Sequence, residues 1–216
     1  MRYRRPKDHK EKIDALIKRG ILLQKENVTS FIGEEELYIE IGMGRGDFLT
    51  EHAKRYPERK FLGIERQVPL LILAGKKIEE ASLSNIRLIG SNASDIESLI
   101  PSDSVEGIYL NFSDPWAKQR YAKRRLTHLE MLRKYENISK NGAKLFFKTD
   151  DLELFRFSIQ QIKMSRYEIT REIWDLYAPD LQQELGETDP IYIKTEYEKK
   201  FISLKKTIFS LECTLV

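Results

Sequence analysis

Short apolar runs alternate with longer amphipathic stretches from residue 37 onward. The short runs are typical of strands, and the longer ones repeat their apolar residues at helical spacing. The predicted strands cover residues 37–41, 60–64, 86–89, 105–112 and 143–148. The predicted helices cover residues 47–56, 67–82, 94–99, 123–140 and 151–164. This alternation favours right-handed βαβ units and a mostly parallel sheet with helices on both faces, which is an α/β fold.

The alternation changes near the end of the chain. Residues 167–175 and 206–215 both have the pattern of strands, and a long polar segment joins them. Only a short helix, around residues 195–202, is predicted between the two. Because no clear crossover helix separates these strands, we expect an antiparallel final pair at one edge of a mixed sheet.

The length of 216 residues fits one domain with a terminal extension. Residues 1–25 hold nine Lys or Arg against three Asp or Glu. We predict a basic N-terminal arm at residues 1–30 and an α/β domain at residues 31–216. The cationic side chains at the start of the arm either clamp RNA or form a solvated end, and both alternatives stay open: Arg2, Arg4, Arg5 and Lys7.

Composition excludes several classes of protein. The chain is 41% hydrophobic and 33% charged, as in globular domains, and no stretch approaches the roughly 18 apolar residues of a membrane helix. The basic N-terminus has no apolar segment behind it, so we expect no secretory signal. A single cysteine, Cys213, excludes an internal disulfide and a cysteine-based zinc site, which fits the cytoplasm. His9, His52 and His128 are far apart, and we expect no metal site.

The sharpest local motif is EIGMGRGDF, residues 40–48, where a strand runs into three glycines and a helix follows. Glycines allow a tight turn and a close approach of the backbone to a ligand. The spacing is G-x-G-x-G, whereas the dinucleotide fingerprint is G-x-G-x-x-G. An acid before the loop, Glu40, would repel a pyrophosphate but attract a sulfonium or amino group.

Glu65 ends the next strand, where a carboxylate can accept hydrogen bonds from ribose hydroxyls. Together with Glu40 it favours S-adenosylmethionine over a dinucleotide. The alternative is a glycine-rich turn flanked by two solvated carboxylates. Asn92, after the third strand, could contact adenine or have no ligand.

The fourth predicted strand is followed by NFSDPWAKQRYAKRRL, residues 111–126. Ligands of open α/β sheets bind at the carboxyl ends of strands, so Asp114 and Trp116 should lie beside the glycine loop. Asp114 can accept hydrogen bonds from guanine N1–H and the exocyclic amine, and Trp116 offers a flat face to a base.

A basic cluster without an acid follows at once: Lys118, Arg120, Lys123, Arg124 and Arg125. Several of these cations fall at the start of the predicted helix 123–140, where the helix dipole disfavours them. A phosphate ligand explains them better than stability does, and an exposed basic face is the alternative. Tyr121 could stack on a base or pack internally.

Two further segments carry acids. Asp150 lies at the end of the fifth strand, and Asp151 could cap the next helix. The segment TEYE, residues 195–198, indicates nothing when taken alone.

Together these segments resemble the bacterial tRNA (guanine-N7-)-methyltransferase family. The matching stretches, in the family's order, are EIGMGRGDF, GIE (63–65), NFSDPWAKQRYAKRRL, KTDD (148–151) and TEYEKKF (195–201). The resemblance implies a Rossmann-like class I S-adenosylmethionine-dependent methyltransferase fold, with a seven-stranded, mostly parallel sheet whose last strand is antiparallel. It also implies methylation of guanine N7 in the variable loop of tRNA, with S-adenosylhomocysteine as product. A monomer and a homodimer both fit the sequence.

The resemblance also implies roles for individual residues. The residues implied to line the S-adenosylmethionine pocket are Glu40, Gly42, Gly44, Gly46, Glu65, Asn92 and Asp114. Those implied to hold the substrate or touch RNA are Lys118, Arg120, Tyr121, Lys123, Arg124, Arg125, Asp150, Thr195, Glu196, Tyr197 and Glu198. The family often has an acid where Asn92 stands, although an amide can also hydrogen-bond adenine.

Guanine N7 carries a lone pair at neutral pH, so its methylation needs no general base. We therefore expect Asp114 to act catalytically by orienting the guanine and stabilising the positive charge that it gains, with Asp150 assisting. Three alternatives remain: a methyltransferase acting on an exocyclic amine, an NAD-linked oxidoreductase, and an RNA-binding module without activity.

Overall fold

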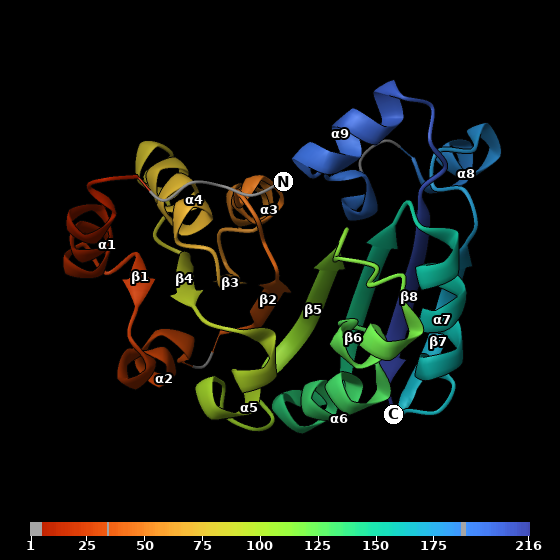
Figure 1. The fold of residues 1–216 in the computed structure, drawn as a ribbon, viewed down its shortest axis with the longest axis horizontal. Helices are drawn as coiled ribbons and strands as arrows, with labels where there is room; N and C mark the ends of the chain where they lie inside the picture. Colours follow the sequence, from red (N-terminus) through yellow and green to blue (C-terminus); the bar gives the residue numbers. More distant parts are fainter. Residues whose placement is uncertain (1–5, 34, 187–188) are drawn as a thin grey trace.

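The computed structural model describes residues 6–33, 35–186 and 189–216, and its strands form one sheet (Figure 1). The strand order is β1-β4-β3-β2-β5-β6-β8-β7. The strands are β1 (Leu22–Leu23), β2 (Leu37–Ile41), β3 (Lys60–Glu65), β4 (Ile86–Gly90), β5 (Val105–Asn111), β6 (Ser139–Thr149), β7 (Tyr167–Ile173) and β8 (Phe209–Leu215). All neighbouring pairs are parallel except those that β8 makes with β6 and β7.

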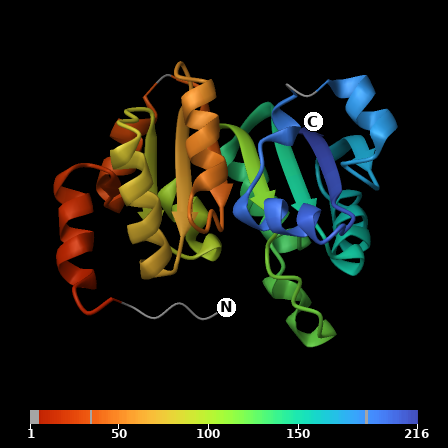
Figure 2. The same cartoon turned by 90° about the horizontal axis from the view of Figure 1, so that it is seen from above.

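Helices cover both faces of this sheet (Figure 2). The helices whose apolar side chains pack on the β3–β4 side of one face are α1 (His9–Lys18), α3 (Asp47–Arg55) and α4 (Val68–Glu80). Those that pack over the larger apolar core are α2 (Val28–Ile32), α5 (Ile96–Leu99), α6 (Leu129–Ile138) and α7 (Leu152–Ile162). The strands β2, β3, β4 and β5 are buried along most of their length, as expected for strands covered on both faces.

The α/β fold, the mostly parallel sheet and the antiparallel strand are confirmed. Residues 206–215 were expected to form the last strand, and β8 lies antiparallel between β6 and β7. After β7, which is the edge strand, the chain folds over the carboxyl ends of the sheet. It then returns as β8, which lies between β7 and β6.

The N-terminal segment contains elements that the pattern did not predict. β1 pairs in parallel with β4, so the sheet has eight strands in the described part of the chain, where seven were expected. A two-residue strand is too short to show an alternating pattern, and α1 is so rich in charged residues that its packing face is narrow. That face is tight, because a Cβ on Gly75 of α4 would lie 2.6 Å from the Leu16 side chain. The domain boundary at residue 30 stays a prediction. Of the cations expected in the arm, Lys7 is exposed, whereas Arg2, Arg4 and Arg5 lie outside the described residues.

The predicted helix 123–140 is wrong in its first turn and a half. Residues Gln119–Arg124 form a short 3₁₀ helix, η3, and α6 begins only at Leu129, with the His128 side chain accepting from the Glu130 N–H at 3.2 Å. Residues 125–128 form a turn, in which the His128 N–H donates to the Arg125 carbonyl at 3.0 Å. Tertiary contacts hold this turn, because Thr127 is buried and the Ser158 hydroxyl donates to its Oγ1 at 2.7 Å. The basic cluster therefore does not lie at the N-terminus of α6, and the argument from the dipole of the predicted helix 123–140 fails.

The described residues of the polar segment between β7 and β8 contain three short elements: α8 (Pro179–Leu185), η4 (Pro190–Tyr192) and α9 (Glu196–Ser203). Of these, only the helix near 195–202 was predicted. They enclose a small apolar core of their own, which includes Leu176 and Ile208 and against which Phe112, just after β5, packs. This core attaches the segment to the end of the sheet where β5 and β6 terminate.

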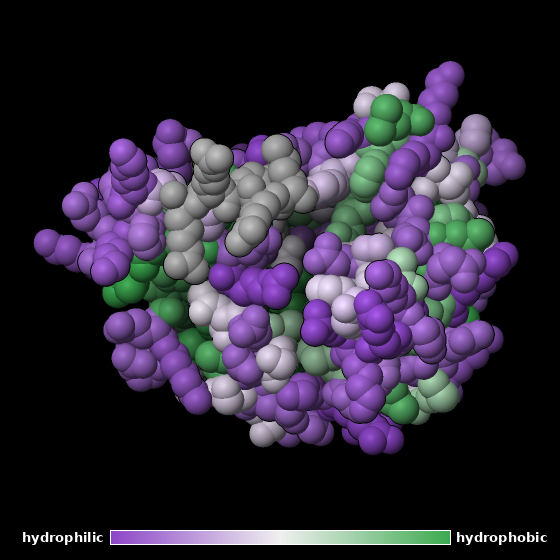
Figure 3. Space-filling view, in the orientation of Figure 1, coloured by the Kyte–Doolittle hydropathy of each residue, from purple (hydrophilic) through white to green (hydrophobic). Residues whose placement is uncertain are grey.

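No helix in the described ranges is long and apolar enough to cross a bilayer. The face in Figure 3 is mostly covered by hydrophilic side chains, with apolar ones in separate patches.

Candidate functional site

The glycine loop connects β2 to α3, and each of its glycines has a backbone that disfavours a side chain. Gly42, Gly44 and Gly46 have φ of 76°, 59° and 73°. L-residues rarely adopt this left-handed region. Gly46 has a second constraint, because a Cβ there would lie 2.9 Å from the Cβ of Ala74 on α4. The third glycine is therefore required for the packing of α3 on α4.

The N–H groups of the loop are largely used inside the chain. Gly42 and Met43 both donate to the Ile64 carbonyl, at 2.8 and 3.3 Å, and Gly46 donates to the Met43 carbonyl at 3.0 Å. Gly44 donates to Oε2 of Glu65 at 3.2 Å. A pyrophosphate needs free N–H donors at such a loop, so these bonds disfavour a dinucleotide.

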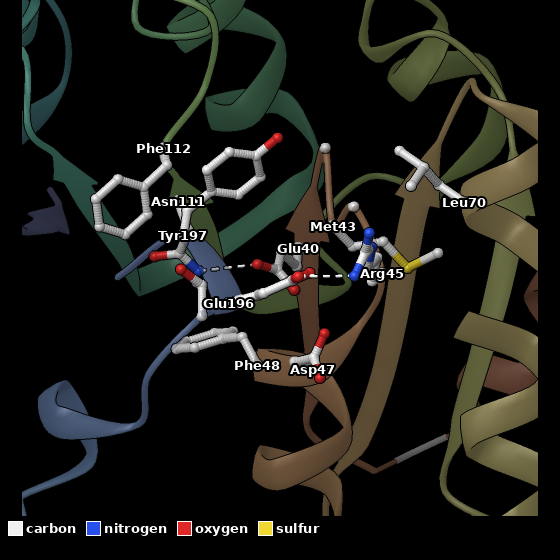
Figure 4. Close-up of a pocket in the computed structure, with 13 residues that line it drawn as sticks. Glu40, Met43, Arg45, Asp47, Phe48, Leu70, Asn111, Phe112, Glu196 and Tyr197 are labelled. Atoms are coloured by element: carbon white, nitrogen blue, oxygen red, sulfur yellow. Dashed lines mark hydrogen bonds and ion pairs between the residues drawn. The ribbon is translucent and has the colours of Figure 1, made fainter. Parts of the chain in front are cut away.

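A cavity opens at the carboxyl ends of β2 and β5, between the glycine loop and the start of α9 (Figure 4). The lining residues that the sequence predicted are Glu40, Gly42, Gly44, Thr195, Glu196 and Tyr197. Those that it missed are Met43, Arg45, Asp47, Phe48, Leu70, Asn111 and Phe112. Asn111 had a visible signal, since it is a polar residue at the end of the apolar strand VEGIYLN.

Glu40 and Asn111 form a buried polar pair in this cavity. The Asn111 amide donates to Oε1 of Glu40 at 2.9 Å, and Glu40 is only 2% exposed (Figure 4). Burial raises the pKa of Glu40 to about 8, although Asn111 and the nearby Lys148 oppose the shift. Among the described residues, the other oxygens of the pair, Glu40 Oε2 and Asn111 Oδ1, are buried without a hydrogen-bond partner. When Glu40 is ionised, these two unsatisfied acceptors suit a cationic N–H donor such as an ammonium group, whose charge would in turn favour the ionised carboxylate.

Glu65 lies at the carboxyl end of β3, as predicted, and its carboxylate accepts a hydrogen bond from the glycine loop. Besides the bond from Gly44, its Oε1 accepts from the Gln67 N–H at 2.8 Å. Burial raises the pKa of Glu65, and these backbone bonds oppose the shift. Each oxygen keeps a lone pair that can accept from a hydroxyl. Asn92 is exposed just before a short 3₁₀ turn and does not line the cavity, so its contact with adenine stays a prediction.

Arg125 donates hydrogen bonds to the turn that follows β5. Its guanidinium donates to the Pro115 carbonyl at 2.9 Å and the Trp116 carbonyl at 3.2 Å, and it lies 4.3 Å from the Phe157 ring. Arg125 is 7% exposed. It therefore supports the turn that carries Asp114, and the grouping of Arg125 with the RNA-contacting cations needs correction. Asp114 itself is exposed and does not line the cavity.

Two of the remaining cations of the cluster, Arg120 and Arg124, lie against aromatic rings. The Arg124 guanidinium lies 4.9 Å from the Trp116 ring and 4.7 Å from the Tyr121 ring, and Arg120 lies 5.0 Å from Tyr121. Lys118, Arg120, Lys123 and Arg124 are exposed, and Lys123 pairs with Glu130 at 2.7 Å. This segment is the green turn that projects from the body of the domain in Figure 2. We call residues 116–124 the aromatic–basic turn.

The ends of β6 and the start of α9 meet on the other side of the cavity. Asp150 pairs with Lys206 at 2.6 Å and does not line the cavity, while Asp151 caps α7 by accepting from the Leu154 N–H. Glu196 pairs with Arg45 of the glycine loop at 2.7 Å. Glu198 is fully buried and paired with Lys148.

Comparison with known sequences gives consistent results. A family model described as a putative methyltransferase matches residues 34–211. The tRNA (guanine-N(7)-)-methyltransferase of Alkaliphilus oremlandii is 38% identical over 188 residues, which cover 87% of this chain and 85% of that protein. The tRNA (guanine-N(7)-)-methyltransferase of Ureaplasma parvum serovar 3 is 42% identical over 185 residues, which cover 83% of this chain and 81% of that protein.

Solved structures share the fold at low sequence identity. The 16S rRNA methyltransferase KamB has a TM-score of 0.66 and 12% identity, with 89% of this chain and 94% of that chain covered. A SAM-dependent methyltransferase from Aquifex aeolicus has a TM-score of 0.58 and 15% identity, with 98% and 100% covered. These likenesses confirm the predicted class I methyltransferase fold.

Proposed function

Because this chain belongs to the tRNA (guanine-N(7)-)-methyltransferase family, we propose that its cavity binds S-adenosylmethionine and that its aromatic–basic turn presents a variable-loop guanine to it. The protein is an S-adenosylmethionine-dependent enzyme that methylates guanine N7 in tRNA. The observation that carries the assignment of the cavity is the buried pair of Glu40 and Asn111, which lines the cavity beside the glycine loop and has two oxygens without a hydrogen-bond partner.

Residues that line the cavity and residues just outside it would divide the binding of S-adenosylmethionine between them. Glu40 and Asn111 would accept from its ammonium group, and Glu65 would accept from its ribose hydroxyls. Gly42, Gly44 and Gly46 let the backbone pass close by, and Asn92 would reach the adenine. When bound, S-adenosylmethionine supplies the electrophilic methyl group.

Guanine would be oriented by carboxylates at the ends of β5 and β6. N7 needs no base to expose its lone pair, so Asp114 acts by hydrogen bonding and by stabilising the charge that the base gains. Because Asp114 lies outside the cavity wall, we assign it to the guanine and not to S-adenosylmethionine. Asp150, paired with Lys206, would support the same charge from the other side.

The aromatic–basic turn would bind the RNA around the target. Exposed cations neutralise phosphates, and Trp116 and Tyr121 offer faces on which a base that has left its stack can rest. Lys118, Arg120, Lys123 and Arg124 are the exposed cations that serve this purpose. A tRNA substrate also favours a cytoplasmic location.

The test is to incubate the protein with unmodified tRNA transcripts and methyl-labelled S-adenosylmethionine, and to map the label to a nucleotide and atom. We expect label on N7 of the variable-loop guanine. A transcript with adenosine at that position is the matched control and should remain unlabelled. Label on an exocyclic amine would replace the assigned reaction, and label on N7 elsewhere would replace the assigned position.

A further inference from the structure

Thr195, Glu196 and Tyr197 form the wall of the cavity that faces the glycine loop, although they are about 150 positions away along the chain. Two ion pairs hold this wall. One is the partly exposed pair of Arg45 and Glu196, which joins the wall directly to the loop. The other is the pair of Lys148 and Glu198, which is buried on both sides.

Lys148 projects from β6 and bonds to residues on either side of this wall. Its Nζ donates to Glu198 Oε1 at 3.0 Å and Oε2 at 3.2 Å, to the Ile193 carbonyl at 3.3 Å, and to the Ile191 carbonyl. One ammonium group thus binds both the stretch before α9 and the helix itself. This arrangement fixes the turn between Ile191 and Glu198 relative to the sheet.

Glu198 has its hydrogen-bonding capacity filled by the protein. Oε1 accepts from Lys148 and from the Tyr177 hydroxyl at 2.7 Å, and Oε2 accepts from Lys148 and from the Thr195 N–H at 3.2 Å. A carboxylate offers about four acceptor positions, and these four bonds occupy them. The carboxylate is also fully buried. A direct contact between Glu198 and the substrate, as the resemblance implied, therefore does not fit this geometry.

We propose that Lys148 and Glu198 are positioning residues, which form a buried latch that holds Thr195–Tyr197 against the glycine loop and thereby sets the affinity for S-adenosylmethionine. The identity of the ligand rests on the proposed function, whereas the latch itself rests on the contacts given above. Neither residue lines the cavity, so the effect on the ligand passes through the wall that they hold.

A double-mutant cycle tests the latch. Removing one partner of a buried ion pair leaves an uncompensated charge, whereas replacing both partners with uncharged residues is much less disruptive. We expect Lys148→Met and Glu198→Gln each to raise the dissociation constant of S-adenosylmethionine, measured by calorimetry without tRNA, by about tenfold or more. The double variant should bind no more weakly than the weaker of the two single variants, because either change already removes the shared pair. Losses that add in the double variant would mean that the two residues act independently, and would overturn the proposal.

A second measurement needs no ligand. Amide hydrogen exchange of the free protein should be faster by about tenfold in residues 190–203 of each single variant, and unchanged in β2 and β5. Unchanged exchange in 190–203 would overturn the latch, whether or not the protein binds S-adenosylmethionine. If wild-type protein fails to bind S-adenosylmethionine while exchange responds as expected, the proposed function fails and the latch stands.

Two further variants keep the test decisive. Lys140→Met is the matched control, because Lys140 lies on the same strand and pairs with Glu106 at 2.6 Å, but at the opposite end of β6 and partly exposed. It should change neither affinity nor exchange.

If the single latch variants do not fold, Tyr177→Phe removes one hydrogen bond to Glu198 and should weaken binding by a few fold with faster exchange in 190–203. Wild-type values for Tyr177→Phe would count against the latch.

Discussion

Burial in the folded protein favours the neutral form of the Glu40 carboxyl, so the free energy of unfolding depends on pH. Its pKa is raised to about 8 from an ordinary value near 4.5, with burial as the main cause. A group whose pKa is higher in the folded state contributes stability below its unfolded pKa and loses that contribution as pH rises. The pH range over which Glu40 makes the folded protein progressively less stable therefore runs from about 4.5 to about 8.

We predict that Glu40→Gln becomes progressively more stable than wild type across that window. The free energy of unfolding of wild type should fall relative to the variant by up to about 1.4 kcal/mol per pH unit, since only the unfolded state is ionised there. Urea unfolding of both proteins at pH 5 and pH 8 measures the change. A constant difference between the two proteins would show that Glu40 is not the group responsible.

Asp114 acts, in our proposal, on the charge that guanine gains during methyl transfer. We predict that Asp114→Asn lowers single-turnover methylation by about 100-fold or more, a typical loss for one charge-stabilising group, while tRNA affinity changes little. Filter binding and single-turnover rates separate the two effects. Asp14→Asn, on the exposed face of α1, is the control and should match wild type. Normal turnover of Asp114→Asn would remove Asp114 from the chemistry.

At the level of elements, the helix that follows the glycine loop packs closely on its neighbour because Gly46 has no side chain. Gly46 and Gly142 both have positive φ, at 73° and 82°. A Cβ on Gly46 would meet Ala74 at 2.9 Å, whereas a Cβ on Gly142 would meet nothing within 4 Å. The two positions share the backbone strain and differ in the steric clash.

We predict that Gly46→Ala lowers the free energy of unfolding by about 1–3 kcal/mol more than Gly142→Ala does, which is the usual cost of overpacking. Chemical denaturation of both variants measures the difference. S-adenosylmethionine affinity should fall for Gly46→Ala alone, because α3 would have to move away from α4 and shift the loop. Equal losses of stability for both variants would mean that strain, and not packing, makes Gly46 necessary.

At the scale of the whole molecule, the cavity and the aromatic–basic turn are separate surfaces with separate tasks. The cavity lies between the glycine loop and α9, while Lys118, Arg120 and Arg124 lie on the projecting turn and do not line it. Phosphate contacts release counterions, so each contact adds roughly 0.7–0.9 to the slope of log affinity against log salt concentration.

We predict that the triple variant Lys118→Ala/Arg120→Ala/Arg124→Ala reduces this slope for tRNA binding by about 2, while S-adenosylmethionine affinity is kept. Fluorescence anisotropy over a salt series gives the slope. Lys163→Ala, at the exposed end of α7, is the control and should leave the slope unchanged. A triple variant with the wild-type slope would place the RNA on another face.

The sequence predicted much of this architecture because local signals are strong where strands and helices alternate. The strands from β2 to β6, the helices between them and the antiparallel β8 all follow from periodicity. The pattern failed at Gln119–His128, where contacts of Arg125 and Thr127 with distant residues keep the backbone out of an α-helix. It also failed at β1, whose two residues are a strand only because β4 lies beside them.

The sequence by itself determined the fold class, the glycine loop and the acids Glu40 and Glu65, because these depend on backbone constraints and on spacing along one βα unit after another. The tertiary structure alone decided that Asn111 completes the polar pair in the cavity, that Arg125 supports the Asp114 turn, and that Glu198 is buried against Lys148. The physical reason is that desolvation and hydrogen-bond saturation depend on which distant segments pack together. Neither desolvation nor hydrogen-bond saturation can be read from charge and residue type alone.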